Sequence, residues 1–192
     1  MSIRIDPERF HGLLATREGK KKSAISDFLY RVPASLGGKA PPQSAVEFLA
    51  GLPALAGLAK KELCLLASAM HERSFGDGEV IFEQGTPSGA LYLIRSGCVA
   101  LSRKTDGTDG ALASLGPNEL FGELALLLDD APRQITATSR GLSDLLALSR
   151  PDFDSLVEKS PVVGMKIFRA LARLVALRFI MLMEEIESAS SK

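Results

Sequence analysis

The sequence is poor in features that would define several other classes of protein. Over 192 residues its formal net charge is zero, and its longest apolar stretch, residues 171–183, contains Arg173 and Arg178. A membrane-spanning helix needs about 20 apolar residues, so we predict no membrane span. A chain without net charge has no broad basic field, so we do not expect non-specific binding to nucleic acid. The N-terminus lacks an apolar run with a cleavage site, which favours a cytoplasmic protein.

Cysteine and histidine are equally scarce. The two cysteines, Cys64 and Cys98, lie in apolar surroundings without metal-ligand spacing, so we predict that both are reduced and buried. The two histidines, His11 and His71, have no partners at a spacing that suits a metal or acid–base chemistry. A cupin enzyme would need clustered histidine and carboxylate ligands, and no nucleophile–base arrangement is evident. We therefore expect neither catalysis nor a cofactor.

Composition divides the chain into three segments. Residues 1–43 form an arm with a lysine run and a Gly/Pro-rich linker, which we interpret as a partner-contact or packing segment, with residues 24–30 as one or two helical turns. Residues 44–160 form the predicted main domain. It begins with a capping-box pattern, Ser44 followed by Glu47, then two short helices separated at Pro53 and a further helix over residues 60–69.

Short apolar runs alternate with turn residues between positions 73 and 150, which is typical of a sandwich or barrel of short strands. We predict seven to eight strands and an α+β fold with a jelly-roll-like β-roll. The runs with the clearest strand character are 80–82, 91–94, 99–102, 111–115, 135–138 and 142–148.

The last segment, 161–192, is predicted to be a long helix. Ser149 and Pro151 begin a short helix before it, and Ser160 with Pro161 marks its own start. The long helix has two apolar stripes, and both must be buried. We therefore predict that one stripe packs on the roll and that residues 161–187 form the interface of a symmetric homodimer.

Between two predicted strands stands a stretch that combines a glycine turn, a carboxylate and an arginine. Gly122 and Glu123 begin a short apolar helix, and Arg133 follows ten residues after the carboxylate. Helix N-termini bind anions, and arginine pairs with phosphate oxygens. A carboxylate would repel a phosphate, so Glu123 is expected to face a neutral donor beside it, such as a sugar hydroxyl.

Several motifs occur in the order typical of one family. The segments 75–85, 91–99 and 121–127, followed by Pro132 and Arg133, resemble the opening strands and the phosphate-binding cassette of cyclic nucleotide-binding domains, and the likeness covers roughly residues 45–187. This resemblance implies a β-roll (a double-stranded β-helix) that binds cAMP or cGMP, with N-terminal helices, a short cassette helix and a long C-terminal helix.

The resemblance also implies roles for individual residues. Glu123 would accept a hydrogen bond from the ribose 2′-hydroxyl, and Arg133 would pair with the cyclic phosphate. Backbone N–H groups of Gly122, Leu124 and Gln134 would complete the phosphate site. From the residues themselves, Leu101, Leu112 and Phe121 are candidate walls of a purine cavity, although apolar strand residues are core residues by default.

Arg178 interrupts the apolar run of the long helix, about where family members bring that helix to the base. It could contact the purine edge, but we favour an arginine at a dimer seam with its head in water. Gln134 and Ile135 depart from the small residue and alanine that the family usually has, and overpacking there could shift the backbone.

Two functions follow from these observations. The first is a cytoplasmic sensor of cAMP or cGMP that signals to an unknown protein effector through its C-terminal helix. The second is a degenerate domain that keeps the fold as a dimeric scaffold or interaction protein without binding nucleotide. Because the sequence ends at Lys192, just after the long helix, we do not expect direct DNA binding.

Overall fold

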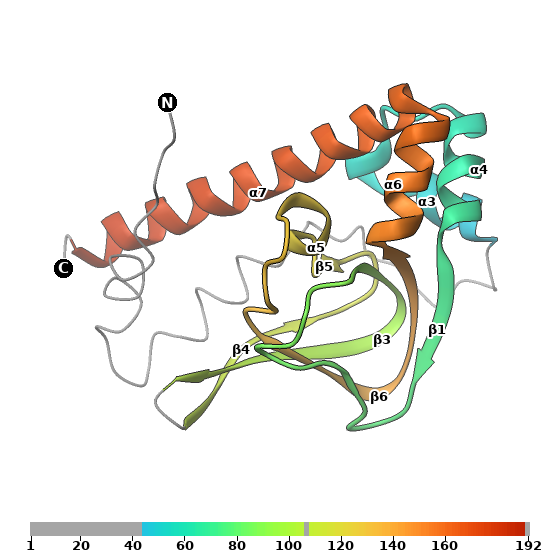
Figure 1. The fold of residues 1–192 in the computed structure, drawn as a ribbon. Helices are drawn as coiled ribbons and strands as arrows, with labels where there is room; N and C mark the ends of the chain where they lie inside the picture. The colour runs from blue at the N-terminus through green and yellow to red at the C-terminus, as the bar shows by residue number, and fades with distance from the viewer. Residues whose placement is uncertain (1–43, 106–107, 191–192) are drawn as a thin grey trace.

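The computed structural model describes residues 44–105 and 108–190. The predictions for the arm, including the helical turns at 24–30, lie outside the described residues. Figure 1 shows a rolled antiparallel sheet with short helices packed at one end and a long helix running above it. The predicted α+β class with a jelly-roll-like β-roll is confirmed.

Within the described residues the sheet contains six strands, all paired antiparallel. Its order is β1–β6–β3–β4, with β2 also paired to β6 and β5 paired to β3. The strands are β1 (His71–Phe75), β2 (Val80–Phe82), β3 (Ala90–Thr105), β4 (Thr108–Leu115), β5 (Leu120–Phe121) and β6 (Thr136–Ser149).

The predicted number of seven to eight short strands is wrong for the described residues, because pairs of expected strands are continuous. Residues 91–94 and 99–102 both belong to β3, and residues 135–138 and 142–148 largely coincide with β6. The turn residue Gly97 lies inside β3 at φ +88°, and a Cβ there would approach the carbonyl oxygen of Leu142 to 2.4 Å. Glycine therefore lets β3 bend tightly against β6 without ending it.

The short helices begin where the sequence predicts. They are α3 (Ala45–Ala50), the 3₁₀ helix η1 (Pro53–Leu55), α4 (Lys60–Ala69) and α6 (Arg150–Lys159). The capping box is present, since Glu47 N donates to Ser44 Oγ and Ser44 N donates to the Glu47 carboxylate. Ser149 caps α6 in the same way, by accepting from the backbone N–H of Asp152.

The long helix α7 (Pro161–Ser190) has one end among α6 and η1, and its other end extends past the roll (Figure 1). Val163, Ile167 and Leu171 are buried, whereas further along Leu177 and Phe179 are more than half exposed. In the first half of α7 one apolar stripe is therefore buried, whereas Val162, Met165 and Phe168 of the same half are exposed. None of the helices over residues 44–105 and 108–190 combines the length and apolar character of a membrane span.

Two apolar cores flank the sheet. One lies between the helices and the outer face of the sheet, and the other fills the roll. The prediction that both cysteines are buried is wrong, because Cys64 is exposed and Cys98 is half-buried. Cys64 lies on the outer side of α4, away from the stripe formed by Leu63 and Leu66.

Candidate functional site

The candidate site begins at a tight turn after β5. Gly122 has φ +74°, and a Cβ at this position would lie 2.8 Å from Nη1 of Arg133 and 3.0 Å from the Ala90 carbonyl oxygen. Glycine is therefore required both for the backbone conformation and for the close approach of the arginine. The turn leads through Glu123 into α5 (Leu124–Leu127), which is a single turn of helix.

The backbone on both sides of Arg133 is fixed by pairing with the loop after β2. Its N–H donates to the carbonyl of Thr86 at 2.8 Å, and its carbonyl accepts from the N–H of Gly85 at 2.8 Å. The guanidinium turns inward, with Nη2 2.7 Å from the Ala90 carbonyl oxygen and Nη1 3.4 Å from that of Gly122. Arg133 is thus anchored as part of the roll wall.

The Arg133 guanidinium is buried and incompletely hydrogen-bonded. The side chain is 6% exposed, and its buried Nε has no hydrogen-bond partner. Burial lowers the pKa of Arg133 from its ordinary value, while Tyr92 and Glu123 act in the opposite direction. A buried cation with an unsatisfied N–H group is a binding group for an anion.

Aromatic rings line the roll beneath this guanidinium. The Arg133 Cζ lies 3.9 Å from the centroid of the Phe82 ring, which is the geometry of a cation–π contact. Phe82 in turn contacts Tyr92 and Phe121, and these last two rings stack at 5.3 Å. Phe121 therefore lies inside the roll, in contact with Phe82 and Tyr92, the two rings that also lie near the Arg133 guanidinium.

The carboxylate of Glu123 faces α7. Arg178 Nη1 lies 2.7 Å from Glu123 Oε1, and Arg178 Nη2 donates to the Leu120 carbonyl at 2.8 Å. Glu123 and Arg178 are each 8% exposed, so the ion pair is buried. The interpretation that Arg178 places its head in water at a dimer seam is therefore wrong, because the guanidinium lies under α7 against the cassette turn.

A second arginine ties α5 to α6. Arg150 donates from Nε to the Ala125 carbonyl at 2.9 Å and from Nη2 to the Leu128 carbonyl at 2.6 Å. The last carbonyls of a helix lack intrahelical donors, so this side chain caps α5 from the start of α6. The cassette helix is consequently connected to both C-terminal helices, through Arg150 and through Arg178.

The other predicted residues take different places. Leu101 and Phe121 are buried in the roll core, with Leu112 packed against it. Ile135 is half-buried against the same core, so its extra volume is accommodated there. Gln134 is exposed, and its side-chain amide donates to the Pro132 carbonyl, so its bulk points away from the buried arginine.

Sequence reasoning did not identify Phe82, Tyr92 or Arg150 as parts of this region. Phe82 and Tyr92 were assigned to strands, but a strand pattern does not say which ring meets a cation across the roll. The pairing of Tyr92 with Phe121 between β3 and β5 brings the rings together. Arg150 stands at the start of α6, where a polar residue is unremarkable.

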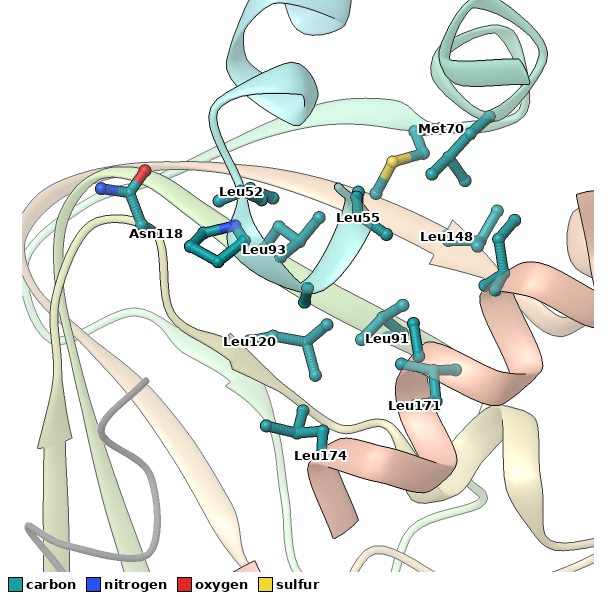
Figure 2. A pocket seen from close by; sticks show the side chains of 15 residues that line it. Leu52, Leu55, Met70, Leu91, Leu93, Asn118, Leu120, Leu148, Leu171 and Leu174 are labelled. Atoms are coloured by element: carbon teal, nitrogen blue, oxygen red, sulfur yellow. The ribbon is translucent and has the colours of Figure 1, made fainter. Parts of the chain in front are cut away.

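Beside the site lies an apolar pocket between η1, β3 and α7, with about 620 Å³ of empty space when its open mouth is included. Figure 2 shows leucines from these three elements converging on it. Among the described residues that line it, Asn118 alone is polar. Leu120 joins the two regions, because its side chain lines the pocket while its carbonyl accepts from Arg178.

Comparison with known proteins agrees with this geometry. Residues 72–160 match the model of the cyclic nucleotide-binding domain family. The chain is 41% identical over 124 residues to the cyclic AMP receptor protein of Thermus thermophilus, covering 64% of this chain and 57% of that protein. It is 38% identical over 114 residues to a cAMP-dependent protein kinase regulatory subunit of Dictyostelium discoideum, covering 57% of this chain and 35% of that one.

A solved structure is also similar to this chain. The N-terminal domain of a transcriptional regulator from Streptomyces coelicolor matches with 35% identity and a TM-score of 0.59, covering 66% of this chain and 88% of that domain. Residues 72–160, the segment that the family model matches, belong to the cyclic nucleotide-binding domain family. It spans 57% and 35% of the lengths of the two curated relatives, which are named as a cyclic AMP receptor and a kinase regulatory subunit.

Proposed function

We propose that the chain is a sensor that binds cAMP or cGMP at the turn formed by Gly122, Glu123 and Arg133. The observation that carries this proposal is the incompletely hydrogen-bonded Arg133 guanidinium, buried within a few ångströms of a glycine turn whose next residue is a buried carboxylate. A cyclic phosphate has one negative charge and acceptor oxygens, which complement a guanidinium.

In this proposal Arg133 pairs with the cyclic phosphate, and the N–H groups of Gly122, Leu124 and Gln134 contribute further donors. Glu123 accepts from the ribose 2′-hydroxyl. Arg178 occupies Oε1 of that carboxylate, which leaves Oε2 to accept from a ligand. Leu101, Leu112 and Phe121 form part of the apolar wall, and the family likeness to cAMP receptors supports a regulatory rather than a catalytic role.

The proposed output passes through α7 to a protein effector in the cytoplasm. This helix exposes a series of large apolar side chains along its length, namely Val162, Met165, Phe168, Leu177, Phe179, Ile180 and Met183. Such a surface favours a homodimer formed by two copies of α7, within the predicted interface 161–187. Phe179→Glu should then yield monomers in sedimentation analysis, whereas Leu142→Glu, at an exposed position of β6, should not.

Titration calorimetry with cAMP and cGMP tests the nucleotide site. We expect saturable binding to the wild-type chain. Arg133→Ala should lose about 1.5–3 kcal/mol of binding free energy, which corresponds to a roughly 10- to 150-fold weaker affinity. Arg140→Ala, an exposed arginine on β6, is the matched control and should bind normally. If the folded wild-type chain binds neither nucleotide below millimolar concentration, the sensor proposal is wrong.

The second candidate function is a dimeric scaffold that no longer binds nucleotide. It is favoured by the hydrogen bonds of Arg133 to two backbone carbonyls, since such bonds would have to be exchanged for bonds to a phosphate. The discriminating measurement is the melting temperature with and without nucleotide. A ligand that binds only the native state raises it, so a scaffold should show no shift in either the wild type or Arg133→Ala.

A further inference from the structure

The apolar pocket beside the site belongs to the outer face of the sheet. Side chains along a strand point alternately to its two faces. Leu91 and Leu93 of β3 therefore both line the pocket, and Figure 2 shows them between η1 and α7. Tyr92, which stands between them in the sequence, packs against the core inside the roll, and the centroid of its ring lies 5.9 Å from Cζ of Arg133. The pocket and the buried arginine thus lie on opposite faces of β3.

Two small side chains leave space in this pocket. Its walls are mostly leucines, but Ala54 of η1 and Ala170 of α7 each contribute only a methyl group. Pro53 and Ala54 are exposed, so the space opens to solvent beside η1. Protein interiors are normally packed as densely as organic crystals, and apolar space that remains unfilled is able to bind small apolar molecules. The pocket is therefore a candidate ligand site of apolar character.

One polar side chain lies at the edge of the pocket (Figure 2). Asn118 has φ 70°, and its backbone N–H donates to the Ile94 carbonyl at 2.8 Å, whereas its side-chain amide makes no hydrogen bond to the described residues. Among the described lining residues none is charged, and the next residue in the chain, Glu119, is itself a buried acid. An anionic head group would lose its hydration without gaining a cation, whereas a hydroxyl or an amide would gain Asn118 as a partner.

We propose that this pocket is a second ligand site, which binds a neutral lipophile with an aliphatic chain and one uncharged polar end. The chain lies among the leucines of the lining, since the described lining residues offer no aromatic ring on which a planar ligand could stack. The polar end pairs with the side-chain amide of Asn118. This inference is independent of the proposed nucleotide site, because the two sites lie on opposite faces of β3.

Titration of the whole chain with 1-butanol, 1-hexanol and 1-octanol tests the site, with the methyl NMR signals of Leu91 and Ile167 as the readout. These alcohols are probes of the ligand class. We expect the signals to shift saturably, and the affinity to rise about fourfold for each added methylene. Octanoate at neutral pH should bind about tenfold more weakly than 1-octanol, because its carboxylate finds no cation among the described lining residues.

Two variants that fill the pocket show where the alcohols bind. Ala170→Phe fills it from α7 and should abolish the saturable shifts, and Ala54→Phe, which places a ring beside η1, should have the same effect. Ala172→Phe, at an exposed position of the same helix as Ala170, is the matched control and should bind normally. Asn118→Gly tolerates the φ of 70° and lacks the amide, so it should bind 1-octanol about 2- to 12-fold more weakly.

Several results would overturn this proposal. Shifts that do not saturate, or that persist in both filling variants, would show that the alcohols bind elsewhere. Octanoate binding as tight as that of 1-octanol, or an unchanged affinity in Asn118→Gly, would contradict a neutral head group paired with the amide. If 1-octanol binds only when Phe28→Glu is introduced, the occupant is the apolar segment 24–30 of this chain and not a separate ligand.

Discussion

The two halves of α7 are attached to the same domain by different forces. The first half buries Val163, Ile167 and Leu171, each at most 4% exposed, against the short helices and the sheet. In the second half the buried side chain of Arg178 forms an ion pair with Glu123 and donates a hydrogen bond to the Leu120 carbonyl. Apolar burial is non-directional and responds little to ligands, whereas a buried ion pair responds to every charge brought near it. One helix thus combines a fixed anchor of apolar packing with an attachment through a buried ion pair.

The largest predicted effect concerns the fixed anchor. Ile167→Ala removes a side chain that is 2% exposed and lines the existing pocket, so the enlarged cavity should lower the free energy of unfolding by about 2–5 kcal/mol. Leu177→Ala in the second half, at 56% exposure, should change it by less than about 0.5 kcal/mol. Chemical denaturation measures both, and similar losses would contradict the difference between the two halves.

The cassette turn that contacts the second half should be the next most sensitive position. Gly122 and Gly141 both have φ +74°, but only at Gly122 would a Cβ meet other atoms, those of Arg133 and Ala90. Both alanine variants carry the left-handed backbone cost of about 1–2 kcal/mol. Because of the added overlap, we expect Gly122→Ala to lower the free energy of unfolding by about 1–3 kcal/mol more than Gly141→Ala does. Chemical denaturation of both variants measures the difference.

A glycine in the first half tests how closely α7 packs on α6. A Cβ on Gly164 would lie 2.6 Å from Cγ2 and 3.1 Å from Cα of Val157. Alanine is the better helix former by about 1 kcal/mol, so a loosely packed helix would gain stability from Gly164→Ala. We instead expect a lower melting temperature, equivalent to a loss of about 1–2 kcal/mol, because the overlap outweighs the propensity. A rise would show that this end of α7 is not tightly packed.

The smallest predicted effect concerns a surface ion pair of the first half. Lys166 Nζ lies 2.7 Å from Glu62 on α4, and the pKa of Glu62 is lowered, mainly by the hydrogen bond from Lys166. A lowered carboxyl pKa stabilises the fold above the unfolded value of about 4.3, and that stability is lost as the pH falls through the folded pKa.

The wild type should therefore melt slightly above Lys166→Met near neutral pH, and the difference should vanish once the pH has fallen below the lowered folded pKa of Glu62. Lys159→Met, an exposed lysine on α6, should show no such pH dependence. A difference that persisted in acid would assign the effect of Lys166 to its aliphatic stem instead of its charge.

Local pattern was sufficient for much of the fold. The starts of α3 and α6 follow from Ser44 and Ser149, and α4 follows from its apolar spacing, because caps and helical periods are local properties. The number of strands was not predictable in this way. Glycines such as Gly97 normally indicate turns, and only the pairing of β3 with β6 shows that the strand continues through the bend.

The sequence by itself determined the order of the motifs, the helical character of the C-terminal segment and the presence of Glu123 and Arg133 around one glycine turn. Only the tertiary structure decided that Arg178, 55 positions after Glu123, pairs with it, and that Phe82 lies against Arg133. The physical reason is the distance along the sequence over which each kind of interaction acts. Capping and periodicity act over a few residues, whereas an ion pair between distant segments depends on where the roll and α7 bring two backbones together.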